Sequence, residues 1–400
     1  MKKIFTFLMG AALCSMPALA AETEAPETPA ADAAATELAA PEAEPEALPQ
    51  ASTLDKIVAN MPKISGYLQT GWNWSKTSAD GSHASSSFQA KRLRLIMDGH
   101  VGSNIDFRLQ IEAFNGIAGS KNGNGQKNLQ VMDAFATWKI APEFKLRFGQ
   151  FYTPLGYENY DISPKTLETV DFSNIVYRMA CRNPYQYNFV DYGRDLGVML
   201  IGDAFDSGKG FRYLHYDIAL TNGSIPCADD NNSSKDFYVS ATVRPIKNFN
   251  VKATFNYGKY KSTALAGGKG VGEGSYNPMH RFVVGAWYND PNGLDLRGEF
   301  GLMKSTVNDV DVVDETGAYV LVGYHAGQFL PIVRWDMYKD DANKASTNNY
   351  NRILLGLNYN LTKNVTFQLN YHHFFYKDEV EKAVGYDSSN QIQLMGRFAF

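Results

Sequence analysis

The chain has 400 residues, of which 38 are Lys or Arg and 42 are Asp or Glu; 13% are aromatic, and the formal net charge is −4. This balance gives no basic excess, so we expect no nucleic-acid partner. No run beyond the N-terminus has the roughly 18 consecutive apolar residues of a membrane-spanning helix, which excludes a helical membrane protein.

The first 20 residues have the features of a secretory signal peptide. Lys2 and Lys3 precede the apolar run 4–13, and a small-residue Ala-Leu-Ala pattern occupies 18–20. This order of a basic start, a short apolar run and a small-residue site is typical of a cleaved export signal. We therefore predict export and cleavage after Ala20.

The next stretch, 21–60, is predicted to be a disordered periplasmic segment. Residues 21–50 are rich in Ala, Pro, Glu and Thr, with eight carboxylates and no Lys or Arg. Such a composition cannot bury enough apolar surface to offset its ordering entropy. It is either a tether that contacts a cationic partner or a solvated spacer.

Residues 61–400 are expected to form one β domain, because apolar and polar residues alternate along many short segments. In 390–400, for example, Ile392, Leu394 and Phe398 fall on one face, and Gln391 and Gln393 fall on the other. An apolar outer face with a polar inner face is the pattern of an outer-membrane barrel. A soluble sheet with the same alternation needs a second sheet to cover it.

The alternating segments predict a 16-stranded antiparallel transmembrane β-barrel, an all-β fold with the even strand number of bacterial barrels. The connections between them are alternately short and long, which indicates short periplasmic turns and long extracellular loops. The expected strands are 64–74, 88–101, 104–114, 129–141, 144–152, 193–203, 211–222, 236–245, 249–260, 280–289, 294–304, 317–326, 328–339, 350–361, 364–376 and 390–400.

The connection 153–192 is exceptional because the period of two disappears for about 40 residues. A connection this long inside a compact fold is usually functional. It carries eight aromatic residues together with Lys165, Arg178 and Arg182. We predict that it folds into the lumen and narrows a pore.

Three motifs in chain order resemble one family. They are Phe-Gly-Gln-Phe-Tyr-Thr-Pro-Leu-Gly-Tyr-Glu at 148–158, Gly-Arg-Asp-Leu-Gly-Val-Met-Leu at 193–200, and Tyr-Asp-Ile-Ala-Leu-Thr-Asn-Gly at 216–223. They resemble the strand-to-loop junction, the re-entry strand and the following hairpin of the phosphate-selective porin O and P family. The pair Arg92 and Arg94 and the run Asp-Ala-Phe at 133–135 also fit this resemblance.

The resemblance implies a channel in the bacterial outer membrane, usually a homotrimer, that passes small inorganic anions and contacts lipid and lipopolysaccharide. The C-terminal Phe400 closes an alternating strand and resembles the signal by which barrels are assembled, so we expect it to engage the assembly machinery.

Charged residues on the predicted inner face give the candidate site. The expected anion path is a basic wall with two loop arginines, namely Arg92, Arg94, Arg108, Lys145, Arg147, Arg178 and Arg182. The carboxylates expected to oppose it across a transverse field are Glu158, Asp161 and Asp171. Alternatively, inward charges pair across strands and stiffen the wall, and the two loop arginines anchor the loop to wall carboxylates.

The function predicted from these observations is passive diffusion of small hydrophilic solutes, with anions such as phosphate preferred. The alternative is a plugged barrel that serves as a surface-binding or enzymatic scaffold. We expect no enzyme activity, cofactor or metal. A disulfide between Cys181 and Cys227 stays open, because sequence does not give the distance between them.

Overall fold

The computed structural model describes residues 61–114, 129–181, 193–224, 227, 230, 233–261, 276–307 and 310–400. The chain divides into two units, Met1–Ser52 and Thr53–Phe400, and all described residues belong to the second. The predicted signal peptide, the predicted acidic segment and Arg182 lie outside the described residues.

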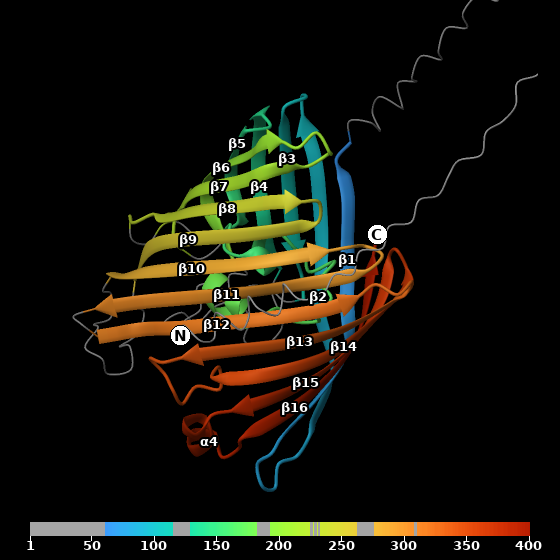
Figure 1. Cartoon of the computed structure of the whole chain (residues 1–400), viewed down its shortest axis with the longest axis vertical. Helices are drawn as coiled ribbons and strands as arrows, with labels where there is room; N and C mark the ends of the chain where they lie inside the picture. The colour runs from blue at the N-terminus through green and yellow to red at the C-terminus, as the bar shows by residue number, and fades with distance from the viewer. Residues whose placement is uncertain are drawn as a thin grey trace, which may run out of the picture. The chain divides into compact units, whose positions relative to one another are not determined.

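Sixteen antiparallel strands form a closed barrel in which each strand pairs with its neighbours in the chain and the last strand pairs with the first (Figure 1). The strands are β1 (Lys63–Thr77), β2 (Ser85–Val101), β3 (Ile105–Glu112), β4 (Gln130–Ala141), β5 (Phe144–Tyr152), β6 (Arg194–Asp206), β7 (Arg212–Thr221), β8 (Asp236–Ile246), β9 (Phe249–Lys261), β10 (Tyr276–Asn289), β11 (Leu294–Val307), β12 (Val310–Tyr324), β13 (Phe329–Asp340), β14 (Tyr350–Thr362), β15 (Val365–Tyr376) and β16 (Ser388–Ala399). The predicted fold and strand order are confirmed.

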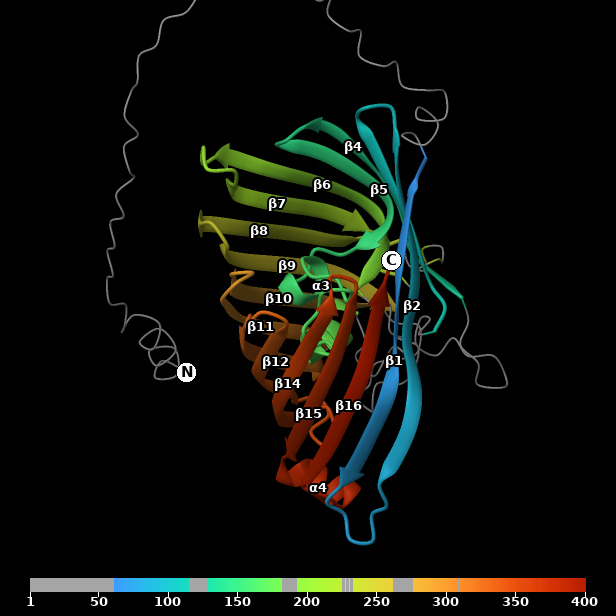
Figure 2. The ribbon, with the colours of Figure 1, turned by 90° about the vertical axis from the view of Figure 1, so that its right-hand side faces the viewer.

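The seam between β1 and β16 closes the ring (Figure 2). Beyond the last strand pair, the backbones of Gly66 and Phe400 exchange two hydrogen bonds of 3.1 and 3.0 Å. A Cβ on Gly66 would lie 2.5 Å from the backbone carbonyl oxygen of Arg94 and 2.7 Å from the Phe400 ring. Glycine is therefore required where the C-terminal ring crosses β1.

The side chains alternate as the sequence predicts. On β16, Leu394 is 49% exposed and Phe398 40%, whereas Gln393 and Met395 on either side of Leu394 are buried. The same arrangement holds around the ring, so large apolar side chains face outward and charged ones face inward. This arrangement is the reverse of that in a soluble protein, and a barrel that spans a bilayer requires it.

One predicted loop is wrong. The sequence predicts a long polar loop over 305–316 between two strands, but β11 and β12 continue their pairing as far as Val307 and Val310. The hydroxyl of Thr306 donates to Asp311 across the hairpin at 2.7 Å. Strand pairing satisfies the hydrogen bonds of the backbone N–H and C=O groups there, whatever side chains the strands carry. A strand of polar residues can therefore form without leaving a hydrophobic pattern in the sequence.

Three short helical segments complete the described fold: α3 (Tyr157–Tyr160), the π-helical segment η1 (Ile175–Ala180), and α4 (Asp378–Val384) between β15 and β16. Within the described ranges, no helix is both long and apolar enough to cross a bilayer. Both α3 and η1 belong to the connection between β5 and β6.

Candidate functional site

The described part of this connection, 153–181, is called the inner loop below. Figures 1 and 2 show the green segment that carries α3 inside the ring of strands. At its root, Thr153 donates from both its backbone N–H and its hydroxyl to the Gly193 carbonyl, at 2.7 and 2.9 Å. This contact joins the residue that follows β5 to the residue that precedes β6.

A carboxylate of the wall caps the first helix of the inner loop. No side chain of the loop caps α3, and the preceding Gly156 has a φ of 75°. Instead, Glu299 of β11 accepts the backbone N–H groups of Tyr157 and Glu158 at 2.5 and 3.0 Å. A Cβ on Gly156 would lie 2.6 Å from that carboxylate. The helix N-terminus, which lacks intrahelical partners for its N–H groups, is thus fixed to the barrel.

Charged side chains of the inner loop pair with opposite charges on the wall. The four acid–base distances are 2.6 Å for Glu158–Arg334, 2.6 Å for Asp161–Lys252, 2.6 Å for Glu168–Arg297 and 2.5 Å for Asp171–Lys91. In a fifth contact the signs are reversed, because Arg178 pairs with Glu315 of β12 and lies 3.5 Å from Asp340 of β13. These contacts reach β2, β9, β11, β12 and β13, so the inner loop is held from many sides.

Lys91 reaches the inner loop because of a β-bulge. Gln69 pairs with Arg92 and Thr70 pairs with Ala90, which leaves Lys91 as the extra residue on β2. A bulge re-aims a side chain out of the strand alternation. Lys91 and Arg92 are neighbours in sequence, yet both contact the inner loop. Parity along β2 assigns Lys91 to lipid, so the sequence analysis missed it.

The apolar residues of the inner loop also pack against the wall. Leu155, Ile175 and Met179 are buried in one cluster with side chains of β5–β8 and β10–β14. The Tyr157 ring stacks on Trp287 of β10 with a centroid distance of 4.2 Å. Burial of this apolar surface adds a non-directional contribution to the ion pairs.

The predicted basic wall separates into two groups. Arg92 and Arg94 are buried: Arg92 donates to Gln69 and to the Val170 carbonyl of the inner loop, and Arg94 pairs with Glu112 at 2.8 Å. They fit the alternative in which inward charges serve as structural contacts. The remaining three line a cavity.

This second group lines a cavity of about 580 Å³, called the β3–β7 cavity, at the end of the barrel that carries the short turns. Three of its bases contact acids, with distances of 2.7 Å for Arg108–Asp98, 2.8 Å for Lys139–Asp106 and 2.9 Å for Lys145–Asp203. Arg147 donates to Thr137 at 3.0 Å and lies over the Phe135 ring at 4.2 Å. Most of the charge in this cavity is therefore balanced.

The carboxylates expected to oppose the basic wall in a transverse field pair with Arg334, Lys252 and Lys91, which are not members of that predicted wall. The three carboxylates predicted to face a basic wall across a gap, Glu158, Asp161 and Asp171, contact bases directly. Arg178 likewise fits the anchoring alternative. The sequence does not show this, because strand parity says which charges face inward but not how close the loop approaches them.

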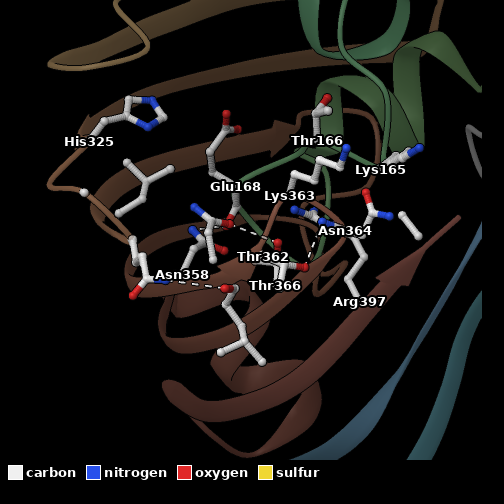
Figure 3. A pocket seen from close by; sticks show the side chains of 16 residues that line it. Lys165, Thr166, Glu168, His325, Asn358, Thr362, Lys363, Asn364, Thr366 and Arg397 are labelled. Carbon is white, nitrogen blue, oxygen red and sulfur yellow. Dashed lines mark hydrogen bonds between the residues drawn. The ribbon is translucent and has the colours of Figure 1, made fainter.

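A second cavity, of about 500 Å³, lies beside β14–β16 at the same end of the barrel and is called the Lys363 cavity (Figure 3). Lys165 of the inner loop, Lys363 of the β14–β15 turn and Arg397 of β16 line it together with Glu168. Glu168 is already paired with Arg297. Arg397 donates to the Leu167 carbonyl at 2.9 Å.

The cavity therefore carries excess positive charge. Among the described residues, Lys165, Lys363 and Arg397 have no ion pair with a carboxylate. In the sequence, Lys165 is one of the cations of the connection 153–192, and Arg397 shares the inward face of 390–400 with Gln391 and Gln393, but no pattern brings the two together or points to Lys363. The three bases are brought together by a turn, by the closing strand and by the loop, which are distant in sequence.

Two other expectations concern cysteines and metals. Cys227 has a free thiol, which donates to the Val131 carbonyl at 3.3 Å. Cys181 and Cys227, both of which the structure describes, are therefore not joined by a disulfide. Within the described ranges, no group of three or more His, Cys, Asp or Glu side chains is arranged to hold a metal ion.

Comparison with known structures supports the architecture. The Salmonella typhi OmpF complex with daunomycin aligns with a TM-score of 0.59 at 15% identity, covering 85% of this chain and 97% of that one. The anion-selective porin from Comamonas acidovorans aligns with a TM-score of 0.56 at 15% identity, covering 85% and 100%. The trimer form of Vibrio cholerae OmpT aligns with a TM-score of 0.57 at 13% identity, covering 85% and 99%. At these identities the likeness concerns the fold.

Comparison with curated proteins finds no match. The family model for phosphate-selective porin O and P matches residues 65–275, which is more than half of the chain and includes all three motifs. Together with the closed sixteen-stranded barrel, this match identifies the chain as a bacterial outer-membrane channel that belongs to the phosphate-selective porin O and P family.

Proposed function

We propose that this channel passes small hydrophilic solutes by passive diffusion, prefers anions such as phosphate, and is narrowed by the inner loop. The observation that carries the preference is the Lys363 cavity, where Lys165, Lys363 and Arg397 have no carboxylate partner among the described residues. Charged side chains that line a pore set its ion preference. An arginine and two lysines at one water-filled site attract phosphate, because a guanidinium and ammonium groups both donate charge-assisted hydrogen bonds.

The β3–β7 cavity contributes less to this preference. Its ion pairs leave Arg147 as the base with no carboxylate partner among the described residues. Arg108 and Lys145 are therefore proposed to guide solute weakly. Arg92, Arg94 and Arg178 are proposed to hold the inner loop, which determines the width of the path.

One observation favours the second candidate, a barrel plugged by the inner loop. The loop is held by five charged contacts and by a buried apolar cluster. A plugged barrel would give no open current steps, and this separates the two functions.

The test is electrical. We expect the purified protein in planar bilayers to give open steps, with a reversal potential in a KCl gradient that shows anion preference. Replacing Lys165, Lys363 and Arg397 with Ala should move the reversal potential toward cation preference. Lys247, which is exposed in the β8–β9 turn, provides the control: Lys247→Ala should leave the reversal potential unchanged. Cation preference in the unmodified protein would refute the proposal, and a complete absence of steps would favour the plugged barrel.

The homotrimer is proposed on the family resemblance and on the trimer form of Vibrio cholerae OmpT. Its measurement is the mass of the protein in detergent. A single subunit mass at all concentrations would contradict it.

A further inference from the structure

The Lys363 cavity is larger than an inorganic anion requires. Its volume of about 500 Å³ equals that of roughly 16 water molecules at about 30 Å³ each. The three bases Lys165, Lys363 and Arg397 form only part of its lining. Figure 3 shows Lys165 and Arg397 to one side of Glu168 and Asn358 to the other. A phosphate group held by the bases therefore leaves most of the cavity unfilled.

The rest of the lining is rich in side chains that both donate and accept hydrogen bonds. They come from β14, β15 and the turns beside them, and they include Gln328, Asn358, Asn360, Thr362, Asn364 and Thr366. Among the described residues that line the cavity, none is Phe, Tyr or Trp. Nucleobases are bound largely by stacking on such rings, so this lining does not suit a nucleotide. Amide and hydroxyl groups suit a ligand that itself carries hydroxyl groups.

Two of the amides have groups free for a ligand. The side-chain oxygen of Asn360 accepts the Thr366 hydroxyl at 2.9 Å. This contact orients the amide and leaves its nitrogen without a partner among the described residues. Asn364 directly follows Lys363 in the β14–β15 turn and is exposed. An amide and an ammonium group therefore reach the cavity from the same turn.

The inner loop forms the opposite side of the cavity, and the wall fixes its backbone. Asn358 donates to the Glu168 carbonyl and Arg397 to the Leu167 carbonyl, each at 2.9 Å. The carboxylate of Glu168, the one acidic side chain in the described lining, is paired with Arg297 at 2.6 Å. An anion thus meets a site that is already ordered and has no unpaired carboxylate, which lowers the cost of binding.

We propose that the Lys363 cavity binds sugar phosphates. The phosphate group contacts Lys165, Lys363 and Arg397, and the sugar hydroxyls contact the amides of Asn360 and Asn364. A phosphate monoester carries a charge of about −1.5 to −2 at pH 7, which the three bases balance. A site that hydrogen-bonds a hydroxyl discriminates against an analogue that lacks it. This inference rests on the proposed anion preference and adds the class of solute.

The test is block of the channel current in planar bilayers by three phosphates. They are glucose 6-phosphate, inorganic phosphate, and cyclohexyl phosphate, which has the ester and a ring but no hydroxyl group on it. We expect glucose 6-phosphate to halve the current at a concentration roughly tenfold lower than either of the others. A tenfold difference corresponds to about 1.4 kcal/mol, which two hydrogen bonds can supply. Glucose at the same concentrations should not block.

Two double variants separate the parts of the site. N360L/N364L should lose the tenfold difference, but it should keep the block by inorganic phosphate and the reversal potential of the unmodified channel. K363A/R397A should weaken the block by all three phosphates, because it removes two of the three charges that hold the phosphate group.

N104L/N292L provides a matched control for the amide variant. Asn104 and Asn292 are exposed in short turns at the same end of the barrel, and neither lines the cavity. This variant should show the same tenfold difference as the unmodified protein. Retained heat-modifiability of each variant on gels will show that the barrel is folded.

The outcomes distinguish this inference from the proposed function. Equal half-blocking concentrations for glucose 6-phosphate and cyclohexyl phosphate, in a channel that prefers anions, overturn the inference and leave the proposed function intact. So does a tenfold difference that persists in N360L/N364L. Cation preference in the unmodified channel refutes the proposed function, and this inference with it. For a barrel that gives no open steps, calorimetric titration in detergent makes the same comparison of the three phosphates.

Discussion

Arg334 of β13 donates to both carboxylate oxygens of Glu158 in α3, at 2.6 and 3.3 Å, and neither side chain is exposed. Arg334 also contacts Asp336 at 3.0 Å, and Asp336 contacts Arg352 at 2.9 Å. The carboxylate of Glu158 further accepts the backbone N–H of Ser173 at 2.8 Å. One arginine of the wall thus fixes two separate parts of the inner loop.

Removing Arg334 should release this part of the inner loop. Arg334→Ala leaves Glu158 buried without its cation, and breaking a buried pair in this way costs about 3–5 kcal/mol. We expect a larger and noisier single-channel conductance together with new protease cleavage between 153 and 181. Arg212→Ala, which breaks an exposed pair with Glu143 at a turn, should change neither readout. Unchanged conductance in Arg334→Ala would show that this contact does not control the width of the path.

Acidification should weaken the contact of Asp171. Burial opposes the charge of this carboxylate, but Lys91, Gln393 and Arg92 outweigh it and hold its pKa below the ordinary value of 3.8. A carboxyl whose pKa is lower in the folded than in the unfolded state stabilises the folded state. This stabilisation is complete at pH values above the pKa of the unfolded state, and it is lost progressively as the pH falls below that pKa. We expect current noise to rise as the pH is lowered from about 5 to about 2.

The Asp171→Asn variant tests the assignment. It keeps the shape of the side chain but not its charge, so it should be noisy already at neutral pH and should change less on acidification. An acid response equal to that of the unmodified protein would assign the effect to another group.

Gly71 should be essential to the β1–β16 seam. A Cβ at this position would lie 2.0 Å from the Leu394 carbonyl oxygen and 2.7 Å from the Met395 Cα, and neither backbone atom can yield without separating the strands. We expect Gly71→Ala to reduce the fraction of folded, heat-modifiable barrel on gels. Thr70→Ala removes only one side-chain hydrogen bond to the Gln89 carbonyl and should cost about 1 kcal/mol. Equal folded fractions for the two variants would contradict the seam argument.

Phe400 should matter for assembly more than for lipid contact. Its ring covers Gly66 beside the two backbone hydrogen bonds that extend the seam. We expect Phe400→Ala to lower the amount of barrel in the outer membrane, as measured by fractionation. Phe398→Ala removes an equally large lipid-facing ring at the same end and is the comparison. Equal losses in both variants would point to lost lipid contact instead.

The positions of the strands, their number and their inward and outward faces can all be read from the sequence alone. A barrel in lipid must present apolar side chains on every second residue, so each strand from β1 to β16 carries its own evidence locally. The same reasoning identified the connection after β5 as the exceptional segment. The prediction is wrong where apolar and polar residues stop alternating. There, β11 and β12 extend as paired strands to Val307 and Val310, where the sequence predicts a loop.

Which charged side chains contact one another depends on the three-dimensional fold. Glu158 and Arg334 are 176 residues apart, and their contact depends on ring closure and on the path of the inner loop. Lys91 faces inward because one bulge shifts the parity of β2. Lys363 and Arg397 share a cavity with Lys165 because a turn, the last strand and the loop converge. Alternation is a property of each strand alone, whereas partners across a lumen are set by the closed geometry of all sixteen.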